Sequence, residues 1–180
     1  MKIEIGLTRL ALVGRSYTLK LPRINLIGPA RRVKNILKRE GEGKWHSLAD
    51  YFAAPTDRWH SFRHDLFKGI AANWREARLS AQLQDVVVPT RFSFLGILNI
   101  QDTADQSRRV DVSFIWGEIY GQIGKEEMDR DFPALSHAFA HPENYGFHEG
   151  RPKLLDYGNK RIGEFLLSHA AFMRKLLSNL

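Results

Sequence analysis

The segment that most constrains the fold covers residues 137–158 and reads HAFAHPENYGFHEGRPKLLDYG. Two short apolar runs flank a Glu149-Gly150 pair, and glycine favours tight turns, so this segment predicts a β-hairpin. Asn144 comes directly before the first predicted strand, and Asp156 comes directly after the second. The two ends of a hairpin lie side by side, so we expect both side chains at the same end. Amide and carboxylate oxygens suit Mg²⁺, a hard ion that prefers oxygen ligands.

The rest of the chain alternates between strand and helix patterns. Alternating apolar residues predict strands in the segments 3–16, 17–24 and 85–102, and Pro22 limits the second of them. The order of strands, helices and hairpin is typical of an α+β fold. We expect residues 1–102 to form a sheet-and-helix part and residues 103–180 a helical part with the hairpin, in one compact unit. Helices are predicted over 30–40, from Ser47 onward, over 57–83, over 110–124 and over 159–180.

The chain is basic, with a formal net charge of +7 and an isoelectric point of about 9.8. A basic surface favours nucleic acids, nucleotides or acidic partners. The charge is spread along the sequence except for one dense run, which predicts either a solvated helix face or a nucleic-acid contact. The basic residues of this run are Arg31, Arg32, Lys34, Lys38 and Arg39.

The composition excludes several other classes of protein. The chain has no cysteine, so disulfides and thiolate metal sites are excluded. The apolar runs are far shorter than a membrane span and the N-terminus lacks the apolar block of a signal peptide, so we expect no membrane contact and a cytoplasmic location. Two histidine pairs at i,i+4 spacing, His60 with His64 and His137 with His141, leave a zinc site as an alternative.

The segment 137–158 resembles the protein-kinase-like superfamily. The kinase catalytic loop reads His-Arg-Asp-Leu-Lys-Pro-Glu-Asn, and Asp-Phe-Gly follows one hairpin later. Residues 137–144, HAFAHPEN, have the same length and the same Pro-Glu-Asn ending, and DYG resembles the second motif, with Tyr157 in the Phe place. The resemblance implies that Asn144 and Asp156 bind Mg²⁺ and that ATP is the ligand.

The resemblance extends upstream to cover residues 3–158. It implies that Lys20, on a predicted strand, pairs with Glu76, on the long predicted helix, and holds the nucleotide phosphates. It also implies a nucleotide-binding hinge at Ile100 and Asp102. The fold implied is kinase-like: a small N-terminal antiparallel sheet with one long helix, plus a truncated helical C-terminal part with a β-hairpin. The DYG ending is similar to that of small kinase-like proteins of bacteriophages and prophages, which implies the host cytoplasm as the location.

The chain also departs from the kinase pattern. Phe139 stands in the place of the catalytic-loop Asp, and phenylalanine cannot accept a hydroxyl proton. The sequence has no Gly-x-Gly-x-x-Gly, and only one predicted helix follows Gly158, so a peptide-substrate platform is missing. These departures favour a pseudokinase-like regulatory protein, which binds Mg-nucleotide or none and docks on a partner protein. The alternatives are a divergent ATP-dependent phosphotransferase or nucleotidyltransferase, and a basic nucleic-acid-binding protein.

Overall fold

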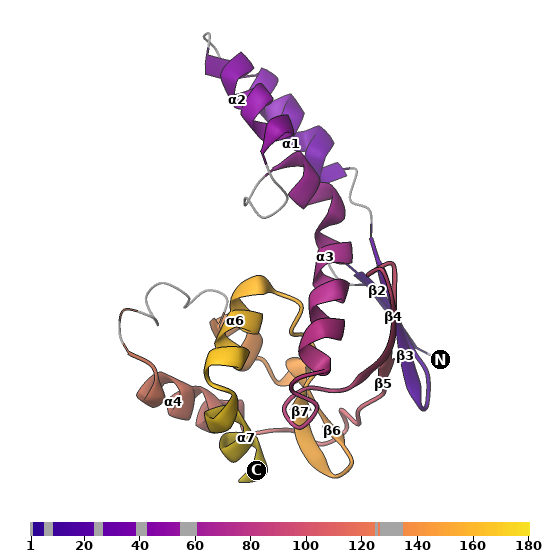
Figure 1. Ribbon diagram of the computed structural model, residues 1–180, viewed down its shortest axis with the longest axis vertical. Coiled ribbons are helices and arrows are strands. Elements are labelled where there is room, and N and C mark those ends of the chain that lie inside the picture. The colour runs from indigo at the N-terminus through magenta and orange to yellow at the C-terminus, as the bar shows by residue number, and fades with distance from the viewer. Residues whose placement is uncertain are drawn as a thin grey trace.

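The computed structural model describes residues 2–5, 9–23, 27–38, 43–54, 61–124, 126 and 135–180. The structure is α+β: an antiparallel sheet near the N-terminus, a long helix against it, and helices around a hairpin near the C-terminus (Figure 1). The predicted α+β class, the N-terminal antiparallel sheet and the C-terminal hairpin are therefore confirmed. No described helix is both long enough and apolar enough to cross a membrane.

Five strands form the sheet in the order β1-β2-β3-β5-β4, and every neighbouring pair is antiparallel. β3 and β5 are neighbours although three helices and the edge strand β4 lie between them in the chain. Pro22 ends β3 as the sequence predicts, because proline lacks the N–H that a further ladder bond needs. The strands are β1 Lys2–Ile5, β2 Arg9–Val13, β3 Tyr17–Pro22, β4 Thr90–Phe94 and β5 Leu98–Asp102.

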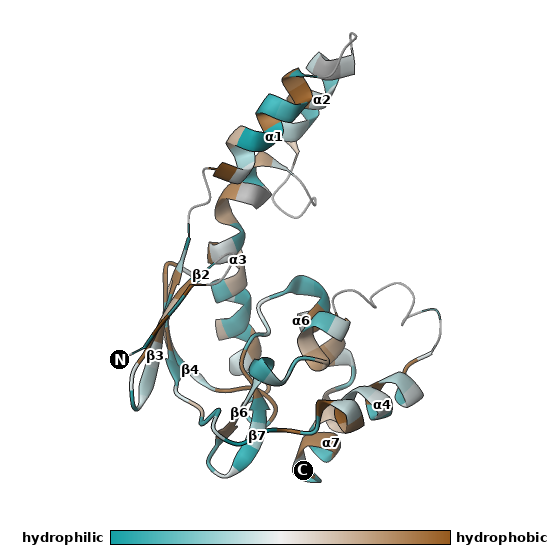
Figure 2. Cartoon of the chain, turned by 180° about the vertical axis from the view of Figure 1, so that it is seen from behind, coloured by the Kyte–Doolittle hydropathy of each residue, from teal (hydrophilic) through white to brown (hydrophobic). Residues whose placement is uncertain are grey.

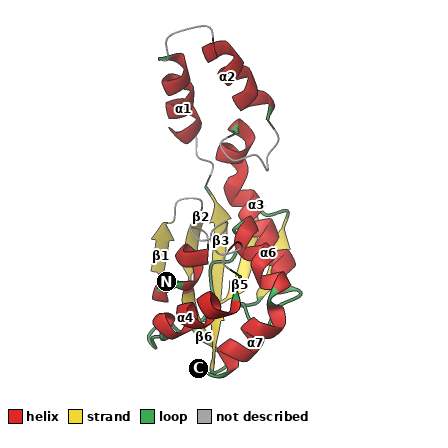
Figure 3. Cartoon of the chain, turned by 90° about the vertical axis from the view of Figure 1, so that its left-hand side faces the viewer, coloured by secondary structure: helices red, strands yellow, loops and turns green. Residues whose placement is uncertain are grey.

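The long helix α3, Phe62–Ser80, packs against β3, β4 and β5 (Figure 3). Lys20 of β3 lies opposite Asn99 of β5, and directly opposed residues share one face of a sheet. Asn73 of α3 fastens the helix to this face. Its side-chain amide nitrogen donates to the Lys20 carbonyl at 3.1 Å and to the Gly96 carbonyl at 3.0 Å, while its backbone carbonyl accepts from the side-chain amide of Asn99 at 2.7 Å. These bonds fix the helix so that its buried polar residues face β3.

Two further helices, α1 Ile27–Leu37 and α2 Gly43–Ala53, lie beyond the N-terminal end of α3, away from the sheet (Figure 1, Figure 3). We call α1 and α2 the helical arm. The prediction of a helix starting at Ser47 is wrong: α2 begins at Gly43, and the Ser47 hydroxyl donates to the Gly43 carbonyl at 2.9 Å inside the helix. The serine is therefore one turn into the helix instead of capping it.

The C-terminal part surrounds the hairpin of β6, Tyr145–His148, and β7, Arg151–Leu154. Glu149 and Gly150 form its turn with φ values of 53° and 77°, a left-handed conformation that glycine adopts without strain. Helix α4, Val112–Gln122, precedes the hairpin, and the 3₁₀ turn Pro142–Asn144 leads into it. Residues 135–139 are helical.

The C-terminal segment is two helices, α6 Lys160–Ser168 and α7 Ala170–Ser178, where the sequence predicts one. The backbone leaves the helical conformation at His169, with φ −113° and ψ 25°. Apolar side chains of both helices contribute to the same core. In Figure 2 hydrophobic segments gather where these helices meet the hairpin and α4. Fully buried side chains of this core include Val87, Ile115, Leu135, Phe139, Leu154, Tyr157, Leu166 and Met173.

Candidate functional site at the junction of sheet, long helix and hairpin

Lys20 and Glu76 form a buried ion pair between β3 and α3. The Lys20 ammonium nitrogen lies 3.0 Å and 3.2 Å from the two Glu76 carboxylate oxygens, and Glu76 is fully buried. Lys20 also donates to the Leu155 carbonyl at 2.9 Å, just before Asp156. The structure thus brings together Lys20, Glu76 and the end of the hairpin, from three separate parts of the chain.

Arg9, at the start of β2, is the fourth member of this cluster. Its guanidinium Nη1 lies 2.6 Å from Glu76 Oε1, and its Nη2 hydrogen-bonds to Asp156 Oδ1. The Arg9 side chain is 12% exposed and the Asp156 side chain 57%. We call Arg9, Lys20, Glu76 and Asp156 the charge cluster. It holds two cations and two carboxylates, so its formal charges cancel.

The protonation states of the charge cluster are set by these contacts. Burial opposes the charge on Arg9, but the carboxylates of Glu76 and Asp156 outweigh it and raise the pKa of Arg9 above its usual value. Desolvation likewise opposes the charge on Asp156, yet Arg9 and Lys20 lower the pKa of this carboxyl. Burial lowers the pKa of Lys20, and Arg9 adds to this, although Glu76 opposes it. Arg9 and Asp156 are therefore charged at neutral pH, and the contact with Glu76 favours the protonated form of Lys20.

The motif DYG is fastened to α3 and to the segment before β4. The Tyr157 side chain is fully buried and its hydroxyl donates to the Val88 carbonyl at 2.8 Å. The Gly158 carbonyl accepts from Arg75 of α3 at 2.9 Å. A Cβ atom at Gly158 would lie 2.8 Å from the Ala72 carbonyl oxygen and 2.9 Å from Ala72 Cβ, so glycine permits the close approach that places Asp156.

Gly158→Ala is accordingly expected to lower the free energy of unfolding by about 1–3 kcal/mol, because the new methyl meets the backbone of a packed helix that cannot move alone. Gly117→Ala is the matched control. Gly117 lies in α4 with nothing within 4 Å of the added atom, so alanine should raise stability by about 0.5–1 kcal/mol through its helix preference. Urea denaturation measures both changes. Equal effects in the two variants would contradict the close approach of Gly158 to α3.

Asn144 lies at the same end of the hairpin as Asp156. Its backbone carbonyl accepts from the Leu155 amide at 2.7 Å, and its side-chain amide nitrogen donates to the carbonyls of His137 and Ala138 at 2.8 and 3.1 Å. The side chain thus ties the 3₁₀ turn to the preceding helical residues.

The residues proposed for Mg²⁺ do not fit a divalent ion while Arg9 holds Asp156, because the one charged ligand is already paired. Asn144 alone offers only a neutral oxygen. Within the part of the chain that the structure describes, no group of three or more histidines and carboxylates is placed to hold a metal. His137 and His141 have ring centroids 5.4 Å apart. His60 lies outside the described residues, as does the side chain of His64.

Phe139, in the place of a catalytic carboxylate, belongs to the core. Its side chain is fully buried, with its ring centroid 5.3 Å from that of Phe165 in α6. The Tyr145 hydroxyl donates to the Phe139 carbonyl at 3.2 Å. This position anchors residues 135–139 to the C-terminal helices and presents no group that can accept a proton.

Ile100 and Asp102, the predicted hinge residues, lie apart from the charge cluster. They alternate with Asn99 along β5 and so occupy the face opposite to Lys20. Asp102 instead accepts hydrogen bonds from Arg91 Nε at 3.0 Å and pairs with His148 Nε2 at 2.9 Å. Burial alone would raise the pKa of Asp102, but Arg91 and His148 lower it below its usual value. Asp102 therefore joins the sheet to β6.

The segment after β5 is joined directly to the hairpin. Asp105 and Phe147 exchange two backbone hydrogen bonds of 2.8 Å each. Ala104 and Gly146 directly precede these two residues, and a Cβ atom on Gly146 would lie only 2.7 Å from the Cβ of Ala104. The two segments are thus in contact at this point.

The predicted basic run lies on the helical arm, beyond the N-terminal end of α3, whereas Glu76 of the charge cluster lies near the C-terminal end of that helix (Figure 1). Arg31, Arg32 and Lys34 are in α1 and Lys38 follows it directly, while Arg39 lies outside the described residues. Sequence reasoning missed Arg9. The signal that could have found it is a single charged residue beginning an otherwise apolar strand, RLALV.

Comparison with known proteins adds no relative: no family model matches the chain, and neither a curated protein nor a solved structure matches it.

Proposed function

We propose that this chain is a kinase-like regulatory binding protein that does not transfer phosphate and that acts by contact with a partner protein. The observation that carries the proposal is the bridge from the Arg9 guanidinium to both Glu76 and Asp156. In this proposal Arg9 supplies, at Asp156, the positive charge that a bound Mg²⁺ ion supplies at the corresponding aspartate of an active kinase.

The arrangement of Lys20, Glu76 and Asp156 supports the kinase-like part of the proposal. In protein kinases a lysine on the third strand pairs with a glutamate of the helix behind the sheet, and a metal-binding aspartate follows a hairpin. Here Lys20 is on β3, Glu76 is on α3 and Asp156 follows β7. Three residues in matching roles, on elements in matching order, support the resemblance more strongly than any one motif.

The charges at the cluster support a site that works without a metal. A Mg²⁺ ion at Asp156 would bring two positive charges next to Arg9 and Lys20, and at about 4 Å each unit pair repels by about 1 kcal/mol even in water. We propose that Mg²⁺ and ATP, which the resemblance implies, bind only when Arg9 releases Asp156. The close approach of Ala104 to Gly146 also places the hairpin against the segment after β5, beside the residues that the resemblance assigns to the hinge.

The burial of Phe139 supports the absence of phosphotransfer. A positioned general base contributes about 10²- to 10⁴-fold to such reactions. Phe139 offers no such group, and its packing against Phe165 gives the position a structural role.

The test measures the melting temperature of the protein with ATP, with and without Mg²⁺, together with transfer of the labelled γ-phosphate. We expect no shift of the melting temperature and no transfer. Binding would be detected, because a ligand at 100 times its Kd adds about 2.7 kcal/mol to the free energy of unfolding. Mg²⁺-dependent stabilisation together with transfer would overturn the proposal. It would favour the second candidate, a divergent phosphotransferase or nucleotidyltransferase, which the Lys20–Glu76 ion pair supports.

A further inference from the structure

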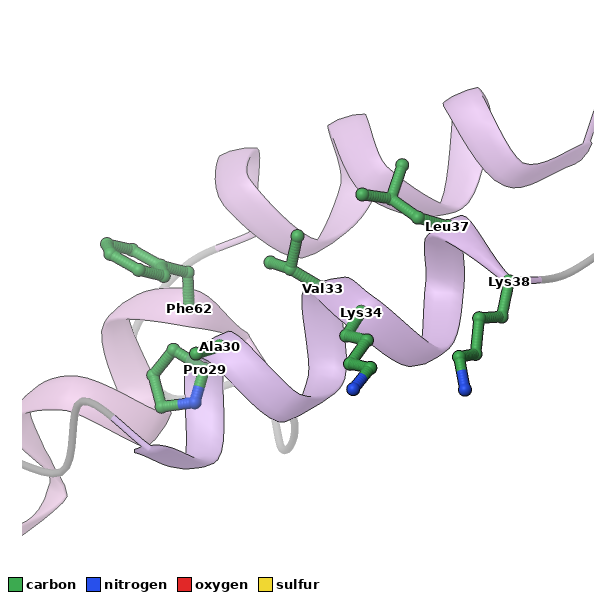
Figure 4. A pocket seen from close by; sticks show the side chains of 7 residues that line it. All are labelled: Pro29, Ala30, Val33, Lys34, Leu37, Lys38 and Phe62. Atoms are coloured by element: carbon green, nitrogen blue, oxygen red, sulfur yellow. The ribbon is translucent and has the colours of Figure 1, made fainter.

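The helical arm carries an open groove along α1. The groove has a volume of about 610 Å³ and begins where α3 meets the arm (Figure 4). Its floor and walls are apolar, and two lysines, Lys34 and Lys38, stand at its edge. In Figure 4 these lysines extend together from one side of α1, while Val33 and Leu37 extend from the other. The apolar lining residues are Pro29, Ala30, Val33, Leu37 and Phe62.

The arm has a small core of its own, so the groove is part of a folded element. Ile36 of α1 and Tyr51 of α2 are 7% and 4% exposed. The Phe62 ring lies 4.9 Å from the Phe52 ring and 6.0 Å from the Tyr51 ring, between centroids. The ring contacts join α2 to the start of α3, and α1 packs against both of these helices.

Apolar surface remains uncovered around this core. Ile27 and Leu37 of α1 are 72% and 46% exposed, and Trp45 and Phe52 of α2 are 62% and 44% exposed. Several large apolar side chains together on one projecting element are unusual for a surface that faces only water. Figure 2 shows such hydrophobic residues beside strongly hydrophilic ones along the arm.

The charge of α1 and of Lys38 directly after it restricts what can cover the groove. Residues 27–38 include four basic residues and no acidic one. Arg32 lies over the Tyr51 ring at 6.0 Å, whereas no ion pair joins Arg31, Lys34 or Lys38 to any residue that the structure describes. A partner that covers the groove must therefore supply apolar anchors and negative charge together.

We infer that the groove on α1 binds an acidic amphipathic helix of a partner protein. Such helices place apolar residues at i, i+3, i+4 and i+7 into apolar grooves, with their charged side chains at the rim. The 11 residues of α1 span about 16 Å, the length of three helical turns. This length accommodates the apolar residues i, i+3, i+4 and i+7 of a partner helix. Glutamates beside the anchors would meet Lys34 and Lys38, and rim charges of opposite sign speed association and select the partner.

A nucleic acid fits the same surface less well. Phosphates would pair with the basic side chains but would leave the five apolar lining residues of the groove without a role. The inference rests on the proposed function, since it names the surface through which the chain contacts a partner protein. Peptide binding and nucleotide binding are separate measurements, so failure of one does not entail failure of the other.

The test measures binding of a labelled 18-residue helical peptide by fluorescence anisotropy. The probe has leucines at i, i+3, i+4 and i+7 and glutamates at most other positions. Comparison probes are a peptide of the same composition in scrambled order, a peptide with lysine in place of glutamate, and single- and double-stranded DNA. We expect the acidic amphipathic peptide to bind at least about tenfold more tightly than either other peptide.

Two variants of the protein separate the parts of the groove. The double substitution Lys34→Glu with Lys38→Glu should weaken binding about tenfold or more, because two attractive contacts become repulsive. Leu37→Ala should weaken it about fivefold through lost apolar contact, without altering charge. The control is Lys160→Glu with Lys175→Glu, which makes the same change in net charge on α6 and α7 and should leave binding unaltered. Circular dichroism checks that each variant is folded.

The inference is overturned if the scrambled peptide binds as tightly as the amphipathic one, or if both sets of lysine substitutions weaken binding equally. DNA binding that falls steeply with salt, is lost in Lys34→Glu with Lys38→Glu and is unaltered in Leu37→Ala would assign the surface to nucleic acid instead.

Discussion

Glu76→Gln is expected to lower the free energy of unfolding by about 3–5 kcal/mol at neutral pH. The substitution keeps the shape of the side chain but removes the charge that faces two buried cations. Lys20 then has no carboxylate in contact, and Arg9 keeps only Asp156. Buried charges without partners account for the size of the loss. Urea denaturation followed by circular dichroism measures it, and Glu118→Gln on the exposed side of α4 should change stability by less than about 0.5 kcal/mol.

The pH dependence of this loss tests its cause. Burial already lowers the pKa of Lys20 in the folded protein, and removing Glu76 lowers it further, since Glu76 raises it. The unfolded chain then binds more protons than the folded variant, so the stability of the variant rises with pH up to the ordinary pKa of lysine. We expect the gap between the variant and the unmodified protein to narrow as the pH rises from 7 to about 10. A gap that stays constant would contradict an unpaired Lys20 as its source.

A double-mutant cycle with Lys20→Met extends the test. Lys20→Met alone leaves Glu76 with Arg9, whereas the double variant removes both members of the Lys20–Glu76 pair. We expect the combined loss to be smaller than the sum of the two single losses, with a coupling of about 1–3 kcal/mol. Additive losses would show that Lys20 and Glu76 do not stabilise each other.

Local sequence signals predicted the elements that position the charge cluster. The Glu149-Gly150 turn and the apolar runs beside it were enough for the hairpin, because turn chemistry acts within a few residues. The periodicity of the long helix was also sufficient. Local signals do not predict the pairing of Lys20 with Glu76, because the two residues are 56 positions apart and no periodicity relates them. That expectation came from resemblance to kinases, and the structure places the two side chains in contact.

Other features depend on distant packing and could not be read from the chain. Arg9 begins a short strand that is otherwise apolar, and its partner Asp156 is 147 positions away. The break at His169 has no signal in the sequence, since the local apolar pattern continues smoothly through it. Asp102 faces away from Lys20 because the register of β5 against β3 decides its face, and a shift by one residue would reverse it.

Arg9→Gln is expected to bind a divalent metal ion at Asp156 more tightly than the unmodified protein does. Without the guanidinium, the Asp156 carboxylate is free on a half-exposed surface, with the Asn144 side chain at the same end of the hairpin. Removing one unit of positive charge about 4 Å from a divalent ion makes binding of the ion more favourable by at least about 2 kcal/mol in water-like surroundings. This corresponds to a roughly thirtyfold tighter Kd, because each 1.4 kcal/mol is tenfold. Titration with Mn²⁺, followed by the loss of its free electron-paramagnetic signal, measures the change.

Three comparison variants decide whether Arg9 itself blocks the ion. Arg9→Lys keeps the positive charge and should bind Mn²⁺ as poorly as the unmodified protein. Arg91→Gln removes a cation that pairs with Asp102 on the other face of the sheet and should also have no effect. Adding Asp156→Ala to Arg9→Gln should abolish the tighter binding, because it removes the charged ligand. If the unmodified protein binds Mn²⁺ as tightly as Arg9→Gln, Asp156 is available without release by Arg9, and the cluster is then open to a metal-bound nucleotide.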